Sequence, residues 1–343
     1  MQLKQKLIIH IGTDKTGTTS LQNFFFNNYK QLLENNIYYP IFETQDKNNP
    51  DHCFKKSHHG EFFGLKSNYK RPISQLVNEI INKKLDLNII SHESLWKYSE
   101  SNLKEMSDLF SRFDLIVVMF VRHQAALLQG MYSQRLKRIV EQGIFKNKNS
   151  TFRPVINGYN FKAKFLDYKF VYKTWKKFFP NCTFIILPFY EAQKNNLNIV
   201  DLFLNYLQIE KSNRYKFQNN RNLSLGYSSV IVFEFWRYLN EYLKIEIKDK
   251  QIDKVKELIK DLPHTINDKH KWFFTKEEVK KISKKFEISN KFIDEKFFPH
   301  EKWLSLEERY IISNICENKK EINIEYLRDV FDYIIYKIEK KEN

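Results

Sequence analysis

Short apolar runs alternate with longer amphipathic segments along the first half of the chain. Four apolar runs predict buried strands, at 7–11, 87–91, 115–121 and 183–187. A fifth, shorter run at 37–39 predicts a strand that Pro40 ends. The segments between them have helical periodicity, at about 73–84, 102–113, 124–141 and 160–179. Strands separated by helices of this length predict a parallel sheet with helices on both faces.

From residue 197 onward the pattern is mostly helical, and polar stretches at 43–60 and 143–158 predict loops. The helical segments lie at about 197–207, 227–243, 251–261, 275–287, 305–316 and 321–339. We see no linker and no internal repeat. The sequence therefore predicts one domain over 1–343, with an α/β core at 1–190 and a mostly helical C-terminal portion at 191–343.

The segment from 7 to 33 predicts a strand, a glycine-containing loop and an amphipathic helix. The apolar face of this helix would contain Leu21, Phe24, Phe25, Tyr29, Leu32 and Leu33. A strand that feeds a helix N-terminus through such a loop favours anion binding, because free N–H groups and the helix dipole converge there. Gly12 and Gly17 fit the G-x-x-x-x-G spacing of a P-loop, but Thr18 stands where the Walker lysine belongs, and Lys15 comes earlier.

The run from Lys15 to Thr19, Lys-Thr-Gly-Thr-Thr, resembles the 5′-phosphosulfate loop of sulfotransferases that use 3′-phosphoadenosine 5′-phosphosulfate (PAPS). The likeness is to bacterial, carbohydrate-type members of that family, and it implies a P-loop-like α/β fold. It also implies cofactor binding by Lys15, Thr16, Gly17, Thr18, Thr19 and Ser20. In this interpretation Lys15 stabilises the charge that develops on the leaving phosphate, and no metal is needed. The alternative is an ordinary strand-to-helix turn capped by Thr and Ser.

The end of the strand at 115–121 gives the second part of the resemblance. Arg122 follows this strand, where the family has an arginine that binds the 3′-phosphate of the cofactor. The family then has a serine eight residues later, but position 130 is glycine here. Ser133 lies three residues further on the same helical face and is the predicted substitute. The alternative for Arg122 is a helix cap or a surface ion pair.

A base is predicted at the end of the strand at 87–91, where Ser91-His92-Glu93-Ser94 follows. Attack by an acceptor hydroxyl on sulfur requires a group that takes its proton. The resemblance implies either a histidine or a glutamate at this place, so both His92 and Glu93 are candidates, with Glu93 favoured. The alternative is that Glu93 caps the following helix and His92 is a surface residue.

Three further residues are weaker candidates. His58 and His59 lie in the polar stretch, and the resemblance implies contact with the acceptor; plain loop polarity explains them equally well. Adjacent histidines without a third ligand at suitable spacing do not predict a metal site. Arg221, in Asn-Asn-Arg-Asn-Leu-Ser-Leu, matches a segment near the 3′-phosphate in the family.

Composition limits the location and the partners. The net charge of +16 favours anionic partners, but the lysines are dispersed and no nucleic-acid-binding module is found. Three widely spaced cysteines predict free thiols in a reducing compartment. The longest apolar run, at 115–121, is too short to cross a bilayer, and no secretory signal is seen. We therefore expect a cytoplasmic protein without membrane insertion.

The resemblance implies transfer of a sulfuryl group from PAPS to an acceptor hydroxyl, with a carbohydrate of a polysaccharide or glycolipid as the expected acceptor. Two alternatives remain open at this stage. One is a P-loop kinase that uses ATP and magnesium, and the other is a non-catalytic relative that binds a nucleotide or a glycan. The absence of an acidic residue at the end of the 115–121 strand argues against the kinase.

Overall fold

A computed structural model of the chain describes residues 4–45, 53–56, 59, 62, 73–141, 164–217 and 274–315. The chain divides into two compact units. The first comprises Met1–Arg122, Ala163–Arg221 and Glu287–Leu306, and the second comprises His123–Lys162, Asn222–Phe286 and Glu307–Asn343. The prediction of a single domain stays a prediction.

The first unit has an α/β fold, with a five-stranded sheet and a separate two-stranded sheet. Its strands are β1 (Lys6–Gly12), β2 (Ile37–Tyr38), β3 (Phe42–Gln45), β4 (Cys53–Lys56), β5 (Leu87–Ser91), β6 (Asp114–Val121) and β7 (Thr183–Pro188). Its helices are α1 (Thr18–Asn27), α2 (Tyr29–Glu34), α4 (Ile73–Lys83), α5 (Glu100–Phe110), α8 (Tyr168–Phe178), α9 (Phe189–Lys194) and α10 (Ile199–Tyr206), with 3₁₀ turns η1 (Leu95–Lys97) and η3 (Lys164–Leu166).

The five strands β2, β5, β1, β6 and β7 form one parallel sheet in that order. Strand β1 lies in the middle, with Ile8 opposite Ile89 of β5 on one side and Ile116 of β6 on the other. The central strands are almost fully buried, as their apolar sequences require. The prediction of a parallel α/β sheet is confirmed, and its strand order is P-loop-like.

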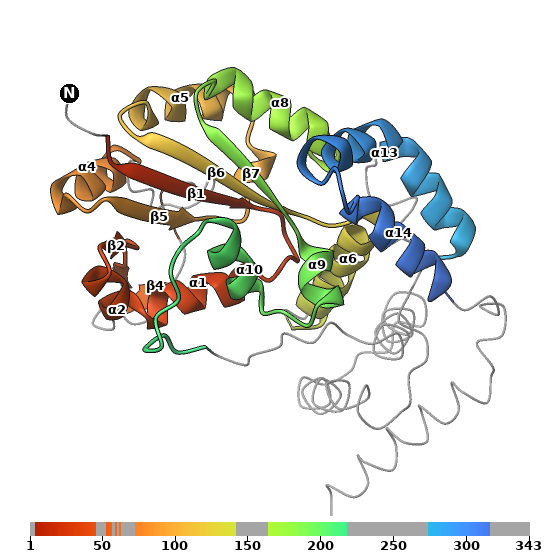
Figure 1. Cartoon of the computed structure of the whole chain (residues 1–343), viewed down its shortest axis with the longest axis horizontal. Coiled ribbons are helices and arrows are strands. Elements are labelled where there is room, and N and C mark those ends of the chain that lie inside the picture. Colours follow the sequence, from red (N-terminus) through yellow and green to blue (C-terminus); the bar gives the residue numbers. More distant parts are fainter. Residues whose placement is uncertain are drawn as a thin grey trace, which may run out of the picture. The chain divides into compact units, whose positions relative to one another are not determined.

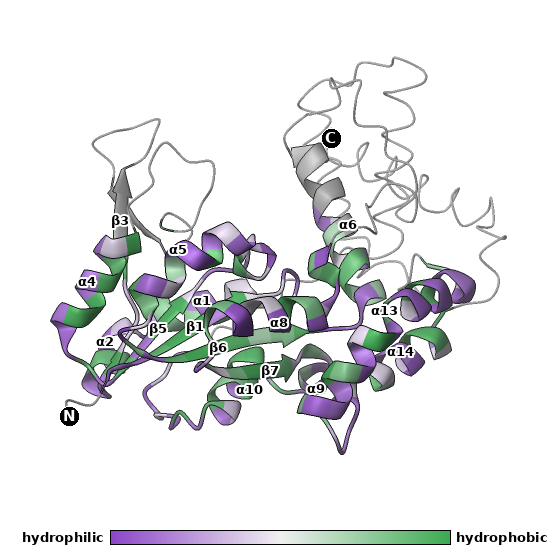
Figure 2. Cartoon of the chain, turned by 90° about the horizontal axis from the view of Figure 1, so that it is seen from above, coloured by the Kyte–Doolittle hydropathy of each residue, from purple (hydrophilic) through white to green (hydrophobic). Residues whose placement is uncertain are grey.

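Helices cover both faces of this sheet. Figure 1 shows α5 and α8 on one face and α1 and α10 on the other. The hydropathy colouring in Figure 2 shows that the strands of the parallel sheet are mostly apolar, whereas the helices combine an apolar and a polar side. Each helix therefore buries one stripe against the sheet. Because all five strands are parallel, the loops that follow β1, β5 and β6 meet at the same edge.

The predicted helix after β1 is in fact two helices, α1 and α2, which meet at Asn28. The Asn28 side chain is fully buried, and its Nδ2 donates to the carbonyl of Phe24 at 2.8 Å. Its Oδ1 accepts from the backbone N–H of Lys216 at 2.7 Å. A short polar side chain that bonds to backbone in this way ends a helix, and the apolar periodicity alone did not reveal it.

The prediction of a loop throughout 43–60 is wrong in part. Strands β3 and β4 pair antiparallel, with Thr44 opposite Phe54. Alternation is weak in such short, mostly polar strands, so the hydrophobic pattern did not indicate them.

After β7, the described residues form helices α9, α10, α13 (Lys276–Phe297) and α14 (Trp303–Ser313), in agreement with a mostly helical C-terminal portion. Helix α6 (Gln124–Glu141) of the second unit matches its predicted bounds. The predicted loop at 143–158 and the predicted helices at 227–243, 251–261 and 321–339 lie outside the described residues. Among the helices that are described, none combines the length and apolar character that crossing a bilayer requires.

Candidate active site

The loop between β1 and α1 is tightly curled. Gly12 ends the strand with φ +118°, and Lys15 and Gly17 have φ of +62° and +76°. The hydroxyl of Thr16 donates to the carbonyl of Thr13 at 2.7 Å, so this buried side chain closes the loop on itself. The left-handed conformations of Lys15 and Gly17, on either side of Thr16, turn the backbone sharply just before the N-terminus of α1.

The N-terminus of α1 has the features of an anion site. Gly17 is its N-cap, no side chain caps it, and its first turn contains no acidic residue. The first intrahelical bonds run from Ser20 and Leu21 to the carbonyl of Gly17. The N–H groups of Thr18 and Thr19 lie before these bonds, at the positive end of the helix dipole. This geometry fits a phosphate or phosphosulfate group.

Glu93 contacts the start of α1. The hydroxyl of Thr18, the first residue of α1, donates to the carboxylate of Glu93 at 2.5 Å. Thr18 is buried and Glu93 is half-buried. His92 continues the strand pairing, because its backbone N–H donates to the carbonyl of His10 at 3.0 Å. The structure thus brings one of the two predicted bases, Glu93, into direct contact with the predicted cofactor loop.

Arg122 holds the same loop from the side of β6. Its Nη1 donates to the carbonyl of Lys15 at 3.1 Å, and its guanidinium lies 5.0 Å from the centre of the Phe189 ring. Its own carbonyl accepts from the hydroxyl of Tyr168 at 2.7 Å. A guanidinium stacked on an aromatic ring has a fixed orientation. The loop, Glu93 and Arg122 therefore follow three neighbouring strands and meet at one edge of the sheet.

Ser91, the last residue of β5, is the centre of a buried hydrogen-bond network. Its hydroxyl lies 2.7 Å from Nδ1 of His10 and accepts from Nε2 of Gln22 at 3.1 Å. Its backbone N–H donates to Nδ1 of His59 at 2.9 Å. These bonds tie β5 to β1, to α1 and to the segment that contains His59. They fix the end of β5 immediately before His92 and Glu93.

His59, predicted to contact the acceptor, is only 1% exposed. Because Nδ1 accepts from Ser91, Nε2 carries the proton and donates to the carbonyl of Pro40 at 2.9 Å. Its ring also packs against Tyr39, with the ring centres 4.7 Å apart. Both ring nitrogens thus connect main-chain segments in this structure, and contact with an acceptor stays a prediction. His58 lies outside the described residues.

His10 is a buried, neutral histidine beneath the loop. Burial, and to a smaller extent the neighbouring His92, lower the pKa of His10 from 6.5 to about 3. The rings of Phe120 and Phe203 lie edge-on to the imidazole, at 5.5 and 6.2 Å between centres. A proton on this ring would be placed among apolar groups, so folding excludes it.

This lowered pKa predicts acid sensitivity. In the unfolded chain His10 takes up a proton below its ordinary pKa of 6.5, whereas the folded chain resists protonation down to about 3. The contribution of neutral His10 to the free energy of unfolding should therefore be fully present above pH 6.5. Below pH 6.5, the free energy of unfolding should fall by about 1 kcal/mol per pH unit. Urea denaturation from pH 7.5 to 5 measures this slope, and His10→Gln should make the slope smaller. An equal slope in both proteins would contradict the assignment to His10.

The remaining predicted residues lie in several places. Thr19 is exposed and Ser20 half-buried on the first turn of α1. Ser133 lies on α6 in the second unit, where its hydroxyl donates to the carbonyl of Gln129 at 3.0 Å. Arg221 lies outside the described residues. Cofactor binding by these three hydroxyl residues and by Arg221 stays a prediction.

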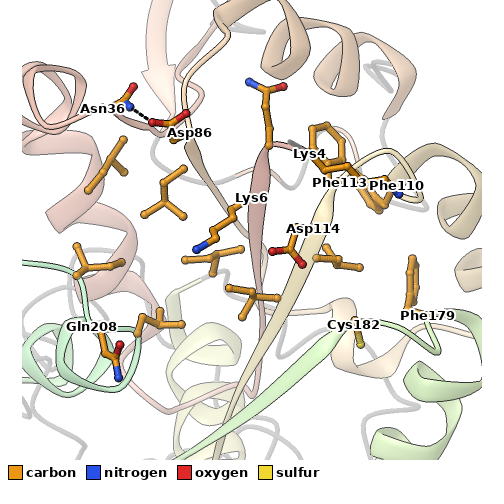
Figure 3. Close-up of a pocket in the computed structure, with 18 of the residues that line it drawn as sticks. Lys4, Lys6, Asn36, Asp86, Phe110, Phe113, Asp114, Phe179, Cys182 and Gln208 are labelled. Carbon is orange, nitrogen blue, oxygen red and sulfur yellow. Dashed lines mark hydrogen bonds between the residues drawn. The ribbon is translucent and has the colours of Figure 1, made fainter. Parts of the chain in front are cut away.

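A large hollow of about 1440 Å³ lies at the other end of the strands. Figure 3 shows Lys6 and Asp114 at the starts of the paired strands β1 and β6, with Cys182 just before β7. The seven residues of β1 separate this hollow from the loop, a distance of roughly 20 Å. We do not assign the reaction site to this hollow, because Thr18, Glu93 and Arg122 lie at the opposite edge of the sheet. The part of the chain that the structure describes contains no group of three or more His, Cys, Asp or Glu suited to a metal ion.

The sequence did not indicate one charged contact at this edge. Nζ of Lys97, on η1, forms an ion pair with the carboxylate of Asp14 in the loop. Nor did it indicate the bond between Thr18 and Glu93. Both contacts join residues far apart in the chain, and no local pattern predicts such pairs. A polar His10 within an apolar strand was the one visible signal of the buried network around Ser91.

The fold is a P-loop-like α/β fold, and the loop after its first strand has a geometry that suits an anion. Among solved structures, the chain is similar to a sulfotransferase from Alicyclobacillus acidocaldarius, with 11% sequence identity and a TM-score of 0.33. That match covers 72% of this chain and 98% of the other. No family model matches the chain, and no curated protein does. The assignment of a function therefore depends on the geometry of the site.

Proposed function

We propose that the protein is a PAPS-dependent sulfotransferase. The observation that carries this proposal is that the ends of β5 and β6, the strands on either side of β1, contact the first residue of α1 and the loop before it. Thr18 of α1 donates to Glu93 after β5, and Arg122 after β6 donates to Lys15 within the loop. An anion site, a carboxylate and two cationic residues thus occupy one edge. The resemblance of the loop sequence to 5′-phosphosulfate loops supports the same assignment.

The residues present fit the phosphosulfate part of the cofactor. The first turn of α1 offers N–H donors and contains no acidic residue of its own, and Gly17 before it has a left-handed backbone conformation. Lys15 and Arg122 add positive charge, which suits a ligand with several negative charges. When bound, PAPS supplies a sulfuryl group on a phosphate leaving group.

Each residue then has a separate task. Glu93 accepts the proton of the attacking hydroxyl, and the bond from Thr18 holds its carboxylate in one orientation. Lys15 balances the charge that develops on the oxygen between sulfur and phosphorus, together with the N–H groups of α1. Arg122 keeps the Lys15 backbone in place and is the expected ligand of the 3′-phosphate. We take the acceptor to be a carbohydrate hydroxyl, from the resemblance to carbohydrate-type sulfotransferases.

The proposal predicts thermal stabilisation by adenosine 3′,5′-bisphosphate without magnesium. A ligand that binds only the folded state at about 100 times its Kd adds about 2.7 kcal/mol, which corresponds to roughly 4 °C in Tm for a chain of 343 residues. Differential scanning fluorimetry measures the shift. Adenosine 5′-monophosphate, which lacks the 3′-phosphate, should give a smaller one.

ATP with magnesium is the informative comparison. A shift with ATP and magnesium, and none with millimolar adenosine 3′,5′-bisphosphate, would indicate a P-loop kinase and exclude the sulfotransferase. A shift with the bisphosphate, together with no release of it from PAPS in the presence of any glycan acceptor, would indicate a non-catalytic binding protein.

A further inference from the structure

The ion pair between Lys97 and Asp14 is partly buried and lies beside two aromatic rings. Lys97 and Asp14 are 30% and 17% exposed. The ammonium of Lys97 also lies 5.3 Å from the centre of the Trp96 ring and 5.5 Å from that of Phe165. An exposed ion pair contributes little, but a cation enclosed by a carboxylate and two aromatic rings has a fixed position.

The turn η1, which contains Lys97, packs directly on the start of the loop. Trp96 is only 2% exposed, and a Cβ placed on Gly12 would lie 2.9 Å from its Cδ1 and 2.5 Å from the carbonyl oxygen of Glu93. The backbone of Gly12 thus touches the segment that joins Glu93 to Lys97. Because η1 packs against Gly12, the position of Lys97 is coupled to that of the loop that contains Asp14.

Asp14 is a negatively charged residue in a loop that we propose binds an anion. It is the one carboxylate in the sequence between Gly12 and Ser20, and it precedes Lys15. Four residues of chain extend at most about 14 Å, so Asp14 lies within that distance of Thr18 at the anion site. Unbalanced, its charge would repel a phosphate or phosphosulfate ligand there.

Glu93 adds a second negative charge at this edge, through its contact with Thr18. Among the Lys, Arg, Asp and Glu side chains discussed at this edge, Lys15, Lys97 and Arg122 are cations and Asp14 and Glu93 are carboxylates. Their sum is one positive charge, and removal of Lys97 reduces it to zero. The attraction for an anionic nucleotide therefore depends on Lys97.

We propose that Lys97 is a positioning residue of the donor site, which cancels the charge of Asp14 and holds that carboxylate away from the bound 5′-phosphate or phosphosulfate of a nucleotide. This inference rests on the proposed function and adds a residue to it. Lys97 acts through Asp14 and makes no contact with the reacting atoms.

The test compares Lys97→Met with the double variant Lys97→Met/Asp14→Asn. Methionine retains an apolar stem against the Trp96 and Phe165 rings and removes the charge. At low ionic strength, Lys97→Met should raise the Kd for adenosine 3′,5′-bisphosphate by about tenfold, because an uncompensated charge then lies near a multiply charged ligand. The double variant should return to within about threefold of the wild type, since it contains no charge to compensate. Isothermal titration calorimetry measures each Kd.

Lys177→Met is the matched control. Lys177 pairs with Glu100 at 2.6 Å on the exposed surface, so this variant loses the same net charge away from the loop. Its Kd should equal that of the wild type. The weakening in Lys97→Met should also decrease to about twofold in 0.5 M salt, which a purely structural defect would not do.

The outcomes separate the two proposals. If the wild type does not bind the bisphosphate, the proposed function fails, and this inference fails with it. If the wild type binds and Lys97→Met binds equally well, only the inference is overturned. It is also overturned if Lys97→Met weakens binding and Asp14→Asn does not restore it, because that result assigns Lys97 to folding of the loop. A urea unfolding curve of each variant verifies that all are folded.

Discussion

Replacing Glu93 by glutamine should lower the rate of sulfuryl transfer by about 10²- to 10⁴-fold, the usual contribution of a general base. The amide oxygen of glutamine can still accept the hydrogen bond from Thr18, so the side chain keeps its place and loses only its ability to take a proton. Affinity for adenosine 3′,5′-bisphosphate should be unchanged or higher, because a negative charge beside the anion site is removed. The rate is measured as release of the bisphosphate from PAPS, with a glycan acceptor or with water.

His92→Gln is the control for this prediction. If Glu93 is the base, this second variant should lose less than about tenfold in rate. The opposite order of losses would make His92 the base. An unchanged rate in both variants would contradict the assignment of a base to this strand end and leave Glu93 only as the hydrogen-bond partner of Thr18.

Replacing Gly12 by alanine should decrease the free energy of unfolding by at least about 3 kcal/mol. At φ +118° a residue with a side chain is strained, and here the added Cβ would also lie 2.5 Å from the carbonyl oxygen of Glu93. Relief requires the backbone of β1 or of the segment after β5 to move. The midpoint of urea denaturation, followed by circular dichroism, measures the loss.

Gly17→Ala is the matched comparison within the same loop. Its φ of +76° is a left-handed conformation that costs an alanine about 1–2 kcal/mol, and the nearest atoms are side-chain carbons of Ile199, from 3.1 Å. These contacts are longer than the 2.5 Å approach at Gly12, and they involve a side chain instead of a backbone carbonyl. We therefore expect the loss for Gly12→Ala to exceed that for Gly17→Ala, and equal losses would contradict the close approach at Gly12.

The sheet could be predicted from sequence because its information is local. The apolar runs at 7–11, 87–91, 115–121 and 183–187 coincide with β1, β5, β6 and β7 within one or two residues. Buried parallel strands require continuous apolar sequence, which few other structures produce in such short pieces. The edge at which the polar residues gather follows from the parallel arrangement.

The pairing of β3 with β4 and the break at Asn28 could not be predicted in the same way. The hairpin has few apolar positions, and Asn28 interrupts the helix through bonds to Phe24 and to Lys216, which is remote in sequence. In both cases a contact between distant or polar residues decides the local structure. Periodicity contains no information on such contacts.

The candidate site shows the same division. The sequence indicated the loop from Gly12 to Ser20, Arg122 and the pair His92 and Glu93, because each directly follows an apolar run. The sequence did not indicate the bond from Thr18 to Glu93 or the ion pair of Lys97 with Asp14. The choice of residue at the site depends on side-chain contacts, which only the folded chain provides.

The central position of β1 has a consequence for how the protein folds. Thr18 and Glu93 are 75 residues apart, His10 and Ser91 are 81 apart, and Lys15 and Arg122 are 107 apart. Pairing across such long intervals has a high entropic cost and slows folding. The loop between β1 and α1 thus acquires its neighbours only when the separate crossovers have closed on β1. Nucleotide binding should therefore appear in the last kinetic phase of refolding, and a fragment that ends before β6 should not bind.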